Sequence, residues 1–221
     1  LVISTHEDGW IWCIPVGPDT RSVGAVMPAQ VLAGRDQRQV FAEHVARSSL
    51  VRGALEGAHP LFEPVKVESD FCYHCELLAG PGYFLTGDAA CFVDPVFSGG
   101  VFLGMVGGMK AAEAIGEVLD GGDEGDAAQR YQDYMKTGYD HYFRLVYAFY
   151  EGCEGTVACL FKDLFPGHFK LVLQLLAGDF WGAEQNPVLR GLRSRRDWDT
   201  FTQPFRPIYE CPVYPHAHYT G

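Results

Sequence analysis

Hydrophobic and polar positions first alternate with a period of two, which predicts strands. Side chains over residues 10–15 point alternately to the two faces of an extended chain. The Gly-Pro-Asp-Thr run at 17–20 predicts a turn, so we expect residues 23–27 to return as the second strand of a hairpin. Farther on, the period becomes helical. Asp36 is placed to cap one helix, and a shorter helix is expected over residues 49–56.

The middle of the chain predicts strands, a glycine-rich loop and a helix. Residues with strand propensity occur over 65–73, and a short apolar strand is expected over residues 83–85. We expect this second strand to be buried and to carry Asp88 at its C-terminal end. A helix is expected from about residue 101 to residue 119, closed by the glycine pair at 121 and 122.

The last region, from about residue 126, predicts helices. Asp126 is a candidate N-cap. Apolar residues recur at helical spacing and are expected to be core: Tyr131, Met135, Tyr142, Leu145 and Phe149. A second helical face carries Phe169, Val172, Leu173 and Leu176. The pattern as a whole predicts a mixed α/β (α+β) fold, with a mainly helical C-terminal domain over residues 121–221.

Composition narrows the classes of function. The 221 residues include 28 acidic and 17 basic side chains, for a net charge of −11, and such a chain repels nucleic acid. No apolar run approaches the roughly 18 residues that span a bilayer. With no visible secretory signal, we expect a cytoplasmic protein with no membrane partner. Since Leu1 is first, we also expect the chain to be part of a longer protein.

The cysteines predict free thiols and no metal site. Their number, seven, is odd and their spacing irregular. Cys72 and Cys75 form a lone C-x-x-C, whereas a zinc site needs a second pair. His216 and His218 could chelate a metal, but a solvated tail is the favoured interpretation.

Residues 85–101, with the sequence LTGDAACFVDPVFSGGV, are the best candidate for chemistry. Asp88 would sit at the end of a strand, where open α/β sheets bind ligands, and Gly87 permits close backbone approach. The start of the next helix offers free N–H groups to an anion or a polarised carbonyl. The glycines at 104, 107 and 108 leave two alternatives open: a flat ligand packs against the helix, or the glycines only allow tight helix–strand packing.

This segment resembles the second FAD-contacting motif of the flavoprotein monooxygenase and halogenase superfamily. The resemblance implies that Asp88 hydrogen-bonds the ribityl chain of the flavin and that the helix start lies against its pyrimidine edge. Residues 1–120 would then be the remainder of an FAD-binding and substrate-binding domain. The implied cofactor-binding residues are Gly87, Asp88, Pro95, Gly99, Gly100 and Val101.

A second motif resembles flavin-dependent halogenases in particular. Trp10, Trp12, Ile14 and Pro15 fit W-x-W-x-I-P, the signature of that family. The alternative interpretation is an amphipathic strand with two stacked aromatic rings. Residues 176–181 also look like the C-terminal helical region of halogenases that act on phenols or pyrroles.

The resemblance implies a reaction and its partners. A separate flavin reductase would supply reduced FAD, and O2 with chloride or bromide would then halogenate an electron-rich aromatic ring in secondary metabolism. The implied halide-binding residues are Ser98, Gly99 and Gly100. Phe97 stands where tryptophan halogenases carry a glutamate, which favours phenol or pyrrole substrates, in some cases tethered to a carrier protein.

Two parts of the family pattern are absent from the sequence. No G-x-G-x-x-G occurs, and the family's catalytic lysine lies upstream of W-x-W-x-I-P, so no catalytic residue is assigned. Two alternatives stay open. One is an FAD-dependent hydroxylase or geranylgeranyl-reductase-like oxidoreductase, and the other is a non-catalytic binding module.

Overall fold

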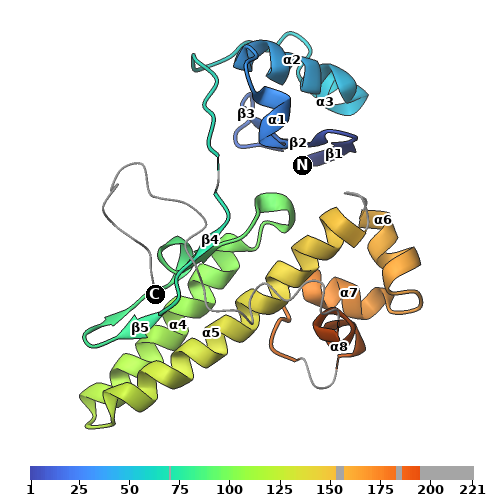
Figure 1. Cartoon of the computed structure of the whole chain (residues 1–221). Helices are drawn as coiled ribbons and strands as arrows, with labels where there is room; N and C mark the ends of the chain where they lie inside the picture. The colour runs from blue at the N-terminus through green and yellow to red at the C-terminus, as the bar shows by residue number, and fades with distance from the viewer. Residues whose placement is uncertain (70, 153–156, 183–185, 195–221) are drawn as a thin grey trace. The chain divides into compact units, whose positions relative to one another are not determined.

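The structure, a computed structural model, describes residues 1–69, 71–152, 157–182 and 186–194. The chain separates into two compact units, Leu1–Ser69 and Asp70–Gly221 (Figure 1). Each unit has its own set of strands and helices.

The first unit is a small antiparallel sheet with helices. Its strands lie in the order β1-β2-β3 and are β1 (Val2–His6), β2 (Gly9–Pro15) and β3 (Arg21–Val26). Its helices are α1 (Ala29–Leu32), α2 (Gln37–Arg47) and α3 (Ser49–Ala54). Ile11 and Cys13 of β2 form a core with Val51 of α3. Alternation along β2 places Ile11 and Cys13 on the same face, and that face packs in this core.

Local signals in the first unit are largely confirmed. The hairpin of β2 and β3 forms as expected, with the Val16 N–H donating to the Thr20 carbonyl at 3.1 Å. The Asp36 carboxylate caps α2 by accepting a hydrogen bond from the Gln39 N–H at 2.8 Å. The pairing of β1 with β2 was not predicted.

The second unit begins with short paired segments. These are β4 (Tyr73–His74), β5 (Ala79–Gly80), β6 (Tyr83–Phe84), the 3-10 turn η1 (Gly87–Ala89), β7 (Cys91–Phe92) and the 3-10 turn η2 (Pro95–Phe97). β4 pairs with β7 and β5 with β6, all antiparallel. Of the described residues in the strand expected over 65–73, only Tyr73 belongs to a strand.

The expectation that a buried strand carries Asp88 is wrong. β6 is two residues long, Tyr83 is exposed, and Asp88 lies in η1 with an exposed side chain. Pairing stops because Thr86 turns away from the sheet, and its hydroxyl donates to the Gly104 carbonyl at 3.1 Å. Asp88 is thus carried by a turn held on the next helix.

Two long helices dominate the second unit. α4 (Gly100–Leu119) and α5 (Glu124–Tyr147) lie side by side and are joined by a tight turn (Figure 1). The helix expected over 101–119 is confirmed. Asp123, and not Asp126, caps α5: its carboxylate accepts from the Asp126 N–H at 2.9 Å. Residue 120 lies in the turn between the two helices, so the compact units follow a different boundary from the one expected there. The functional division at residue 120 stays a prediction.

The remaining helical segments follow α5. They are the π-turn η3 (Ala148–Gly152), α6 (Val157–Cys159), the π-turn η4 (Leu160–Leu164), α7 (Phe169–Leu176) and α8 (Pro187–Ser194). The predicted aromatic and aliphatic stripe of α5 is confirmed as core, with every member buried. The face predicted for α7 is only partly correct: Val172 and Leu175 are buried, while Phe169 is 60% exposed. The buried face of α7 therefore includes Leu175 and not Phe169.

Cysteine chemistry differs from the prediction at one position. Cys13, Cys72, Cys75 and Cys91 are free thiols, but Cys159 is disulfide-bonded. An odd number of cysteines left room for such a pair. Burial raises the pKa of Cys72 to about 11, which favours the protonated thiol. His216, His218 and the two other cysteines lie outside the described residues.

The described residues offer neither a metal-binding cluster nor a membrane-spanning helix. No group of three or more His, Cys, Asp or Glu side chains there is arranged to hold a metal ion. No helix there is long and apolar enough to cross a membrane.

Candidate functional site

Glycines within the 85–101 loop and in α4 allow the backbone of the loop to lie against this helix. Gly87 has a positive φ of 58°, and a Cβ built on Gly104 would lie 3.4 Å from the Gly87 Cα. A Cβ on Gly107 would lie only 2.1 Å from the Thr86 hydroxyl oxygen. Tight packing therefore accounts for Gly107, whereas a Cβ on Gly104 would make only ordinary van der Waals contact with Gly87. Gly108, by contrast, has nothing within 4 Å of a built Cβ.

Most of the predicted cofactor residues line one cavity of about 280 Å³. The residues from the predicted sets that line it are Asp88, Pro95, Ser98, Gly100 and Val101. The Asp88 carboxylate is exposed, and its backbone carbonyl accepts a hydrogen bond from the Tyr73 hydroxyl at 2.6 Å. Gly87 and Gly99 do not line this cavity. Residues spread over 14 positions of the sequence thus converge on one hollow.

The start of α4 faces the same cavity. No side chain caps this helix, so the N–H groups of its first turn have no helical partner. Gly100 and Val101, the first two residues of α4, line the cavity. The partial positive charge of a helix N-terminus therefore lies beside the exposed carboxylate of Asp88. An anion or the polar edge of a ring would find donors here.

Asp94 adds a half-buried carboxyl that the sequence analysis did not single out. It lines the 280 Å³ cavity. One carboxylate oxygen accepts from the Val96 N–H at 2.8 Å, and the other accepts from the Tyr150 hydroxyl at 3.1 Å. Burial raises the pKa of Asp94, and these two hydrogen bonds oppose the rise. The carboxyl fixes the start of η2.

Tyr142 of α5 holds the other end of η2. Its hydroxyl donates to the Asp94 carbonyl at 2.9 Å and accepts from the Gly99 N–H at 3.2 Å. Burial raises the pKa of Tyr142 to about 12, so the phenol keeps its proton. The Gly99 N–H, predicted as a halide donor, is therefore already paired. Of the predicted halide residues, Ser98 and Gly100 line the larger cavity and Gly99 does not.

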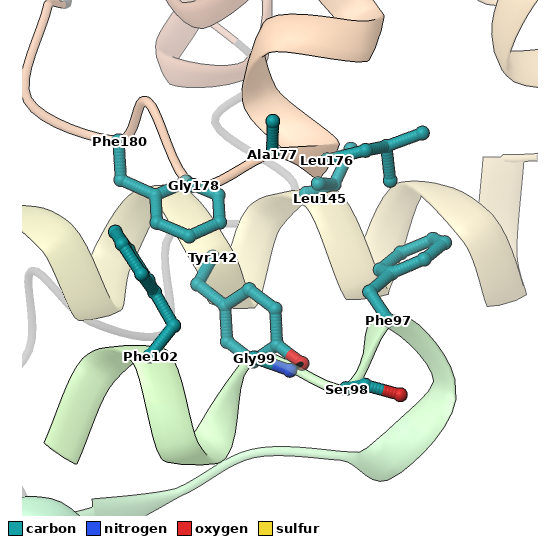
Figure 2. A pocket seen from close by; sticks show the side chains of 10 residues that line it. All are labelled: Phe97, Ser98, Gly99, Phe102, Tyr142, Leu145, Leu176, Ala177, Gly178 and Phe180. Carbon is teal, nitrogen blue, oxygen red and sulfur yellow. Dashed lines mark hydrogen bonds between the residues drawn. The ribbon is translucent and has the colours of Figure 1, made fainter. Parts of the chain in front are cut away.

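A second cavity of about 100 Å³ is lined by residues of the loop, α4, α5 and the 176–180 segment (Figure 2). Aromatic side chains gather around it: Phe97, Phe102, Tyr142 and Phe180. The Phe102 and Phe180 ring centroids are 6.3 Å apart, and those of Tyr142 and Phe180 are 5.4 Å apart. Ser98 and Tyr142 line both cavities. Residues of the loop therefore line two cavities, a larger and mainly apolar one with Asp88 and Asp94 in its wall and a smaller aromatic one.

The 176–181 segment completes the aromatic cavity. Gly178 has a φ of 101°, and a Cβ there would lie 2.6 Å from the Phe102 ring. Trp181 stacks on Tyr134 with ring centroids 4.8 Å apart, and its indole N–H donates to the Tyr134 carbonyl at 2.7 Å. This segment is thereby fixed to α5.

The W-x-W-x-I-P residues lie on β2 of the first unit, and both cavities belong to the second. Trp10 is buried, and Trp12 is half-buried with its ring over Gly24. The two indole centroids are 5.8 Å apart and tilted by 48°. The Trp12 indole N–H donates to the Ser22 hydroxyl at 3.2 Å. Strand packing accounts for these contacts, and a further role of Trp10, Trp12, Ile14 and Pro15 stays a prediction.

Comparison with known proteins decides the family. Residues 2–157 match the sequence model of the family described as tryptophan halogenase. The chain belongs to this halogenase family. Tryptophan 2-halogenase of Chondromyces crocatus is 33% identical over 158 residues, covering 68% of this chain and 30% of that protein. A 1H-pyrrole-2-carbonyl-(peptidyl-carrier protein) brominase of Pseudoalteromonas luteoviolacea (strain 2ta16) is 31% identical over 140 residues, covering 62% of this chain and 34% of that protein.

A solved structure supports the same assignment. The flavin-dependent brominase Bmp2 superposes with a TM-score of 0.71 at 28% identity, over 85% of this chain and 47% of that chain. The resemblance to flavin-dependent halogenases and the mixed helix-and-strand fold are therefore confirmed. The chain spans about a third of the length of the two curated relatives above. Since these are a tryptophan halogenase and a pyrrole brominase, their names do not select a substrate.

Proposed function

We propose that the protein is an FAD-dependent halogenase of electron-rich aromatic compounds. In the overall reaction, an aromatic C–H, a halide ion, a proton, O2 and reduced FAD give the carbon–halogen bond, oxidised FAD and two waters. The observation that carries the proposal is the position of the 85–101 loop. Its residues line both a cavity that contains Asp88 and the start of α4 and a cavity of aromatic side chains. Family membership supports the same reaction.

The larger cavity suits part of FAD. At about 280 Å³ it falls below the roughly 300–1,000 Å³ of a whole ligand site, and no pyrophosphate motif occurs in the sequence. Asp88 would accept hydrogen bonds from the ribityl hydroxyls, and Pro95, Gly100 and Val101 would contact the flavin edge. When bound and reduced, FAD supplies the electrons that activate O2. Gly87 would act indirectly, by holding η1 on α4.

The halide, chloride or bromide, would bind at the start of α4. Backbone N–H groups at a helix N-terminus favour anions. Gly100 supplies such a group within the cavity, and Ser98 supplies a hydroxyl beside it. Gly99 would contribute only if its hydrogen bond to Tyr142 opened.

The aromatic cavity is our candidate for the ring to be halogenated. Phe97 gives it an apolar wall, which favours a phenol or pyrrole over free tryptophan. The pyrrole-carrier brominase among the relatives supports a substrate tethered to a carrier protein. We further propose a separate flavin reductase as partner and a role in secondary metabolism. No lysine of the described residues lines either cavity, and no catalytic residue is assigned.

One assay tests the reaction. The full-length protein is incubated with FAD, a flavin reductase, NADH, bromide and a panel of phenols and pyrroles, free and carrier-bound. We expect a brominated product with the bromine isotope doublet in its mass spectrum. Hydroxylated product without bromination would refute the proposal in favour of a hydroxylase, and absence of flavin binding would favour a non-catalytic module.

A variant pair tests the halide position. Gly100→Glu places a carboxylate beside the helix amides and should raise the bromide KM. Gly100→Ala is the control, because a Cβ there meets only the Phe92 ring, at 4.0 Å. Equal bromide KM values for the two variants would count against halide binding at Gly100.

A further inference from the structure

We propose that Tyr142 is a positioning residue for the halogenation site. Its hydroxyl ties the loop of residues 94–99 to α5 and so fixes the direction in which the Gly100 and Val101 amides face the larger cavity. The inference rests on the proposed function for its effect on halide, but the tie itself can be measured independently.

The tie joins two backbone groups of the loop to one side chain of the core. Tyr142 is 2% exposed, and its hydroxyl bonds to the Asp94 carbonyl at 2.9 Å and the Gly99 N–H at 3.2 Å. Asp94 precedes η2, and Gly99 is the N-cap residue of α4. The hydroxyl therefore holds both ends of the turn that delivers α4 to the cavity.

Backbone geometry shows why the turn needs such a tie. Ser98 adopts a positive φ of 54°, which is unfavourable for a residue other than glycine. A conformation of this kind persists where surrounding contacts determine it. Removing the hydroxyl would leave the buried Gly99 N–H without its acceptor and the Asp94 carbonyl without this donor. The turn would then sample other conformations, and the amides of α4 would lose their fixed direction.

The ring and the hydroxyl of Tyr142 act separately. The ring leaves no room for a side chain at Gly99, because a Cβ there would lie 2.7 Å from it. The hydroxyl occupies the Gly99 N–H, so an anion is left with the amides of Gly100 and Val101. Tyr142→Phe removes the hydrogen bond to the Gly99 N–H and keeps the ring that excludes a side chain at Gly99.

α5 supplies a matched control one turn earlier. Tyr139 is as buried as Tyr142, but its hydroxyl has no hydrogen-bond partner among the described residues. Tyr139→Phe therefore removes a buried hydroxyl without breaking a tie to the loop. Both variants are made in the full-length enzyme.

The first readout is amide hydrogen exchange, which needs no activity. We expect the Gly99 amide to exchange about 5- to 30-fold faster in Tyr142→Phe, as for the loss of one or two hydrogen bonds, and to be unchanged in Tyr139→Phe. Unchanged Gly99 exchange in Tyr142→Phe would overturn the proposal. If that variant does not accumulate, amide exchange in the wild-type protein tests the proposal. The Gly99 amide must then exchange more slowly than the Gly100 amide, and equal exchange rates would overturn the proposal.

The second readout separates positioning from stability. We expect Tyr142→Phe to raise the bromide KM about 5- to 30-fold with kcat at saturating bromide nearly kept, because looser amides weaken anion binding. General destabilisation would instead lower the active fraction and hence kcat. An unchanged bromide KM would overturn the proposal. A wild-type protein that binds FAD but does not halogenate refutes the proposed function, and Gly99 exchange still decides whether Tyr142 holds the loop.

Discussion

Replacing Gly107 with alanine tests whether the helix glycines serve packing against the loop. A Cβ at this position would lie 2.1 Å from the Thr86 hydroxyl oxygen, 3.1 Å from the Thr86 Cβ and 3.3 Å from the Met135 methyl carbon. Rotating the Thr86 side chain relieves the first contact but not the second. It would also break the hydrogen bond from that hydroxyl to the Gly104 carbonyl.

The magnitude follows from three opposing effects. Overpacking a filled site costs about 1–3 kcal/mol, and the lost hydrogen bond costs about 0.5–1.5 kcal/mol. Alanine in place of glycine within a helix returns about 1 kcal/mol. We therefore expect Gly107→Ala to lower the free energy of unfolding by roughly 0.5–3.5 kcal/mol.

Urea denaturation of the full-length protein, followed by far-UV circular dichroism, measures the effect. Gly108→Ala is the control. A Cβ there has no neighbour within 4 Å, so the helix gains about 0.5–1 kcal/mol. In a Thr86→Ala background, Gly107→Ala should lose most of its cost, because the clashing hydroxyl is gone. Equal midpoints for Gly107→Ala and Gly108→Ala would refute the packing argument.

Three further changes have distinct expected results. Asp88→Asn should weaken FAD binding about 10- to 100-fold in a flavin fluorescence titration, as for a lost hydrogen bond to a charged group. Asp120→Asn in the α4–α5 turn is the control. An equal effect of Asp120→Asn on FAD binding would contradict the role of Asp88 as a ligand of the flavin. Burial lowers the pKa of His74 to about 4, so the native state favours the neutral ring. The stability that this ring contributes is complete above pH 6.5 and is lost as the pH falls toward 4. His74→Gln should flatten that part of a stability profile measured by denaturation between pH 7.5 and 4; an unchanged slope would assign the loss to other groups. Gly138→Ala should lower the melting temperature, because its Cβ would lie 2.3 Å from the Trp181 ring; an unchanged melting temperature would mean that this ring moves freely.

Local signals carried most of what the sequence could predict. The Asp36 cap, the β2–β3 hairpin and the extent of α4 depend on residues a few positions apart, and each is confirmed. The buried stripe of α5 follows from helical periodicity alone. The location of the candidate site was also predictable, because the loop and the helix start are contiguous in sequence.

Long-range contacts account for what was missed. The hydrogen bonds from Tyr142 and Tyr150 to Asp94 join residues 48 and 56 positions apart. No local pattern marks such a pair: Tyr142 lies within α5, and Tyr150 lies just beyond it in η3. Strand propensity likewise could not show that β6 ends before Asp88, since Thr86 leaves the sheet for a partner on α4.

The contact between the Gly87 and Gly104 backbones has a consequence for how the enzyme could be diversified. A side chain at Gly87 would be strained by the positive φ of 58°, and a Cβ at Gly107, one turn farther along α4, would lie 2.1 Å from the Thr86 hydroxyl oxygen. Substitution at either position would therefore disturb the turn that carries Asp88. The rings of Phe97, Phe102 and Phe180, by contrast, line the smaller cavity directly. A mutational library aimed at new substrates should therefore be concentrated on these three rings. It should leave Gly87 and Gly107 unchanged.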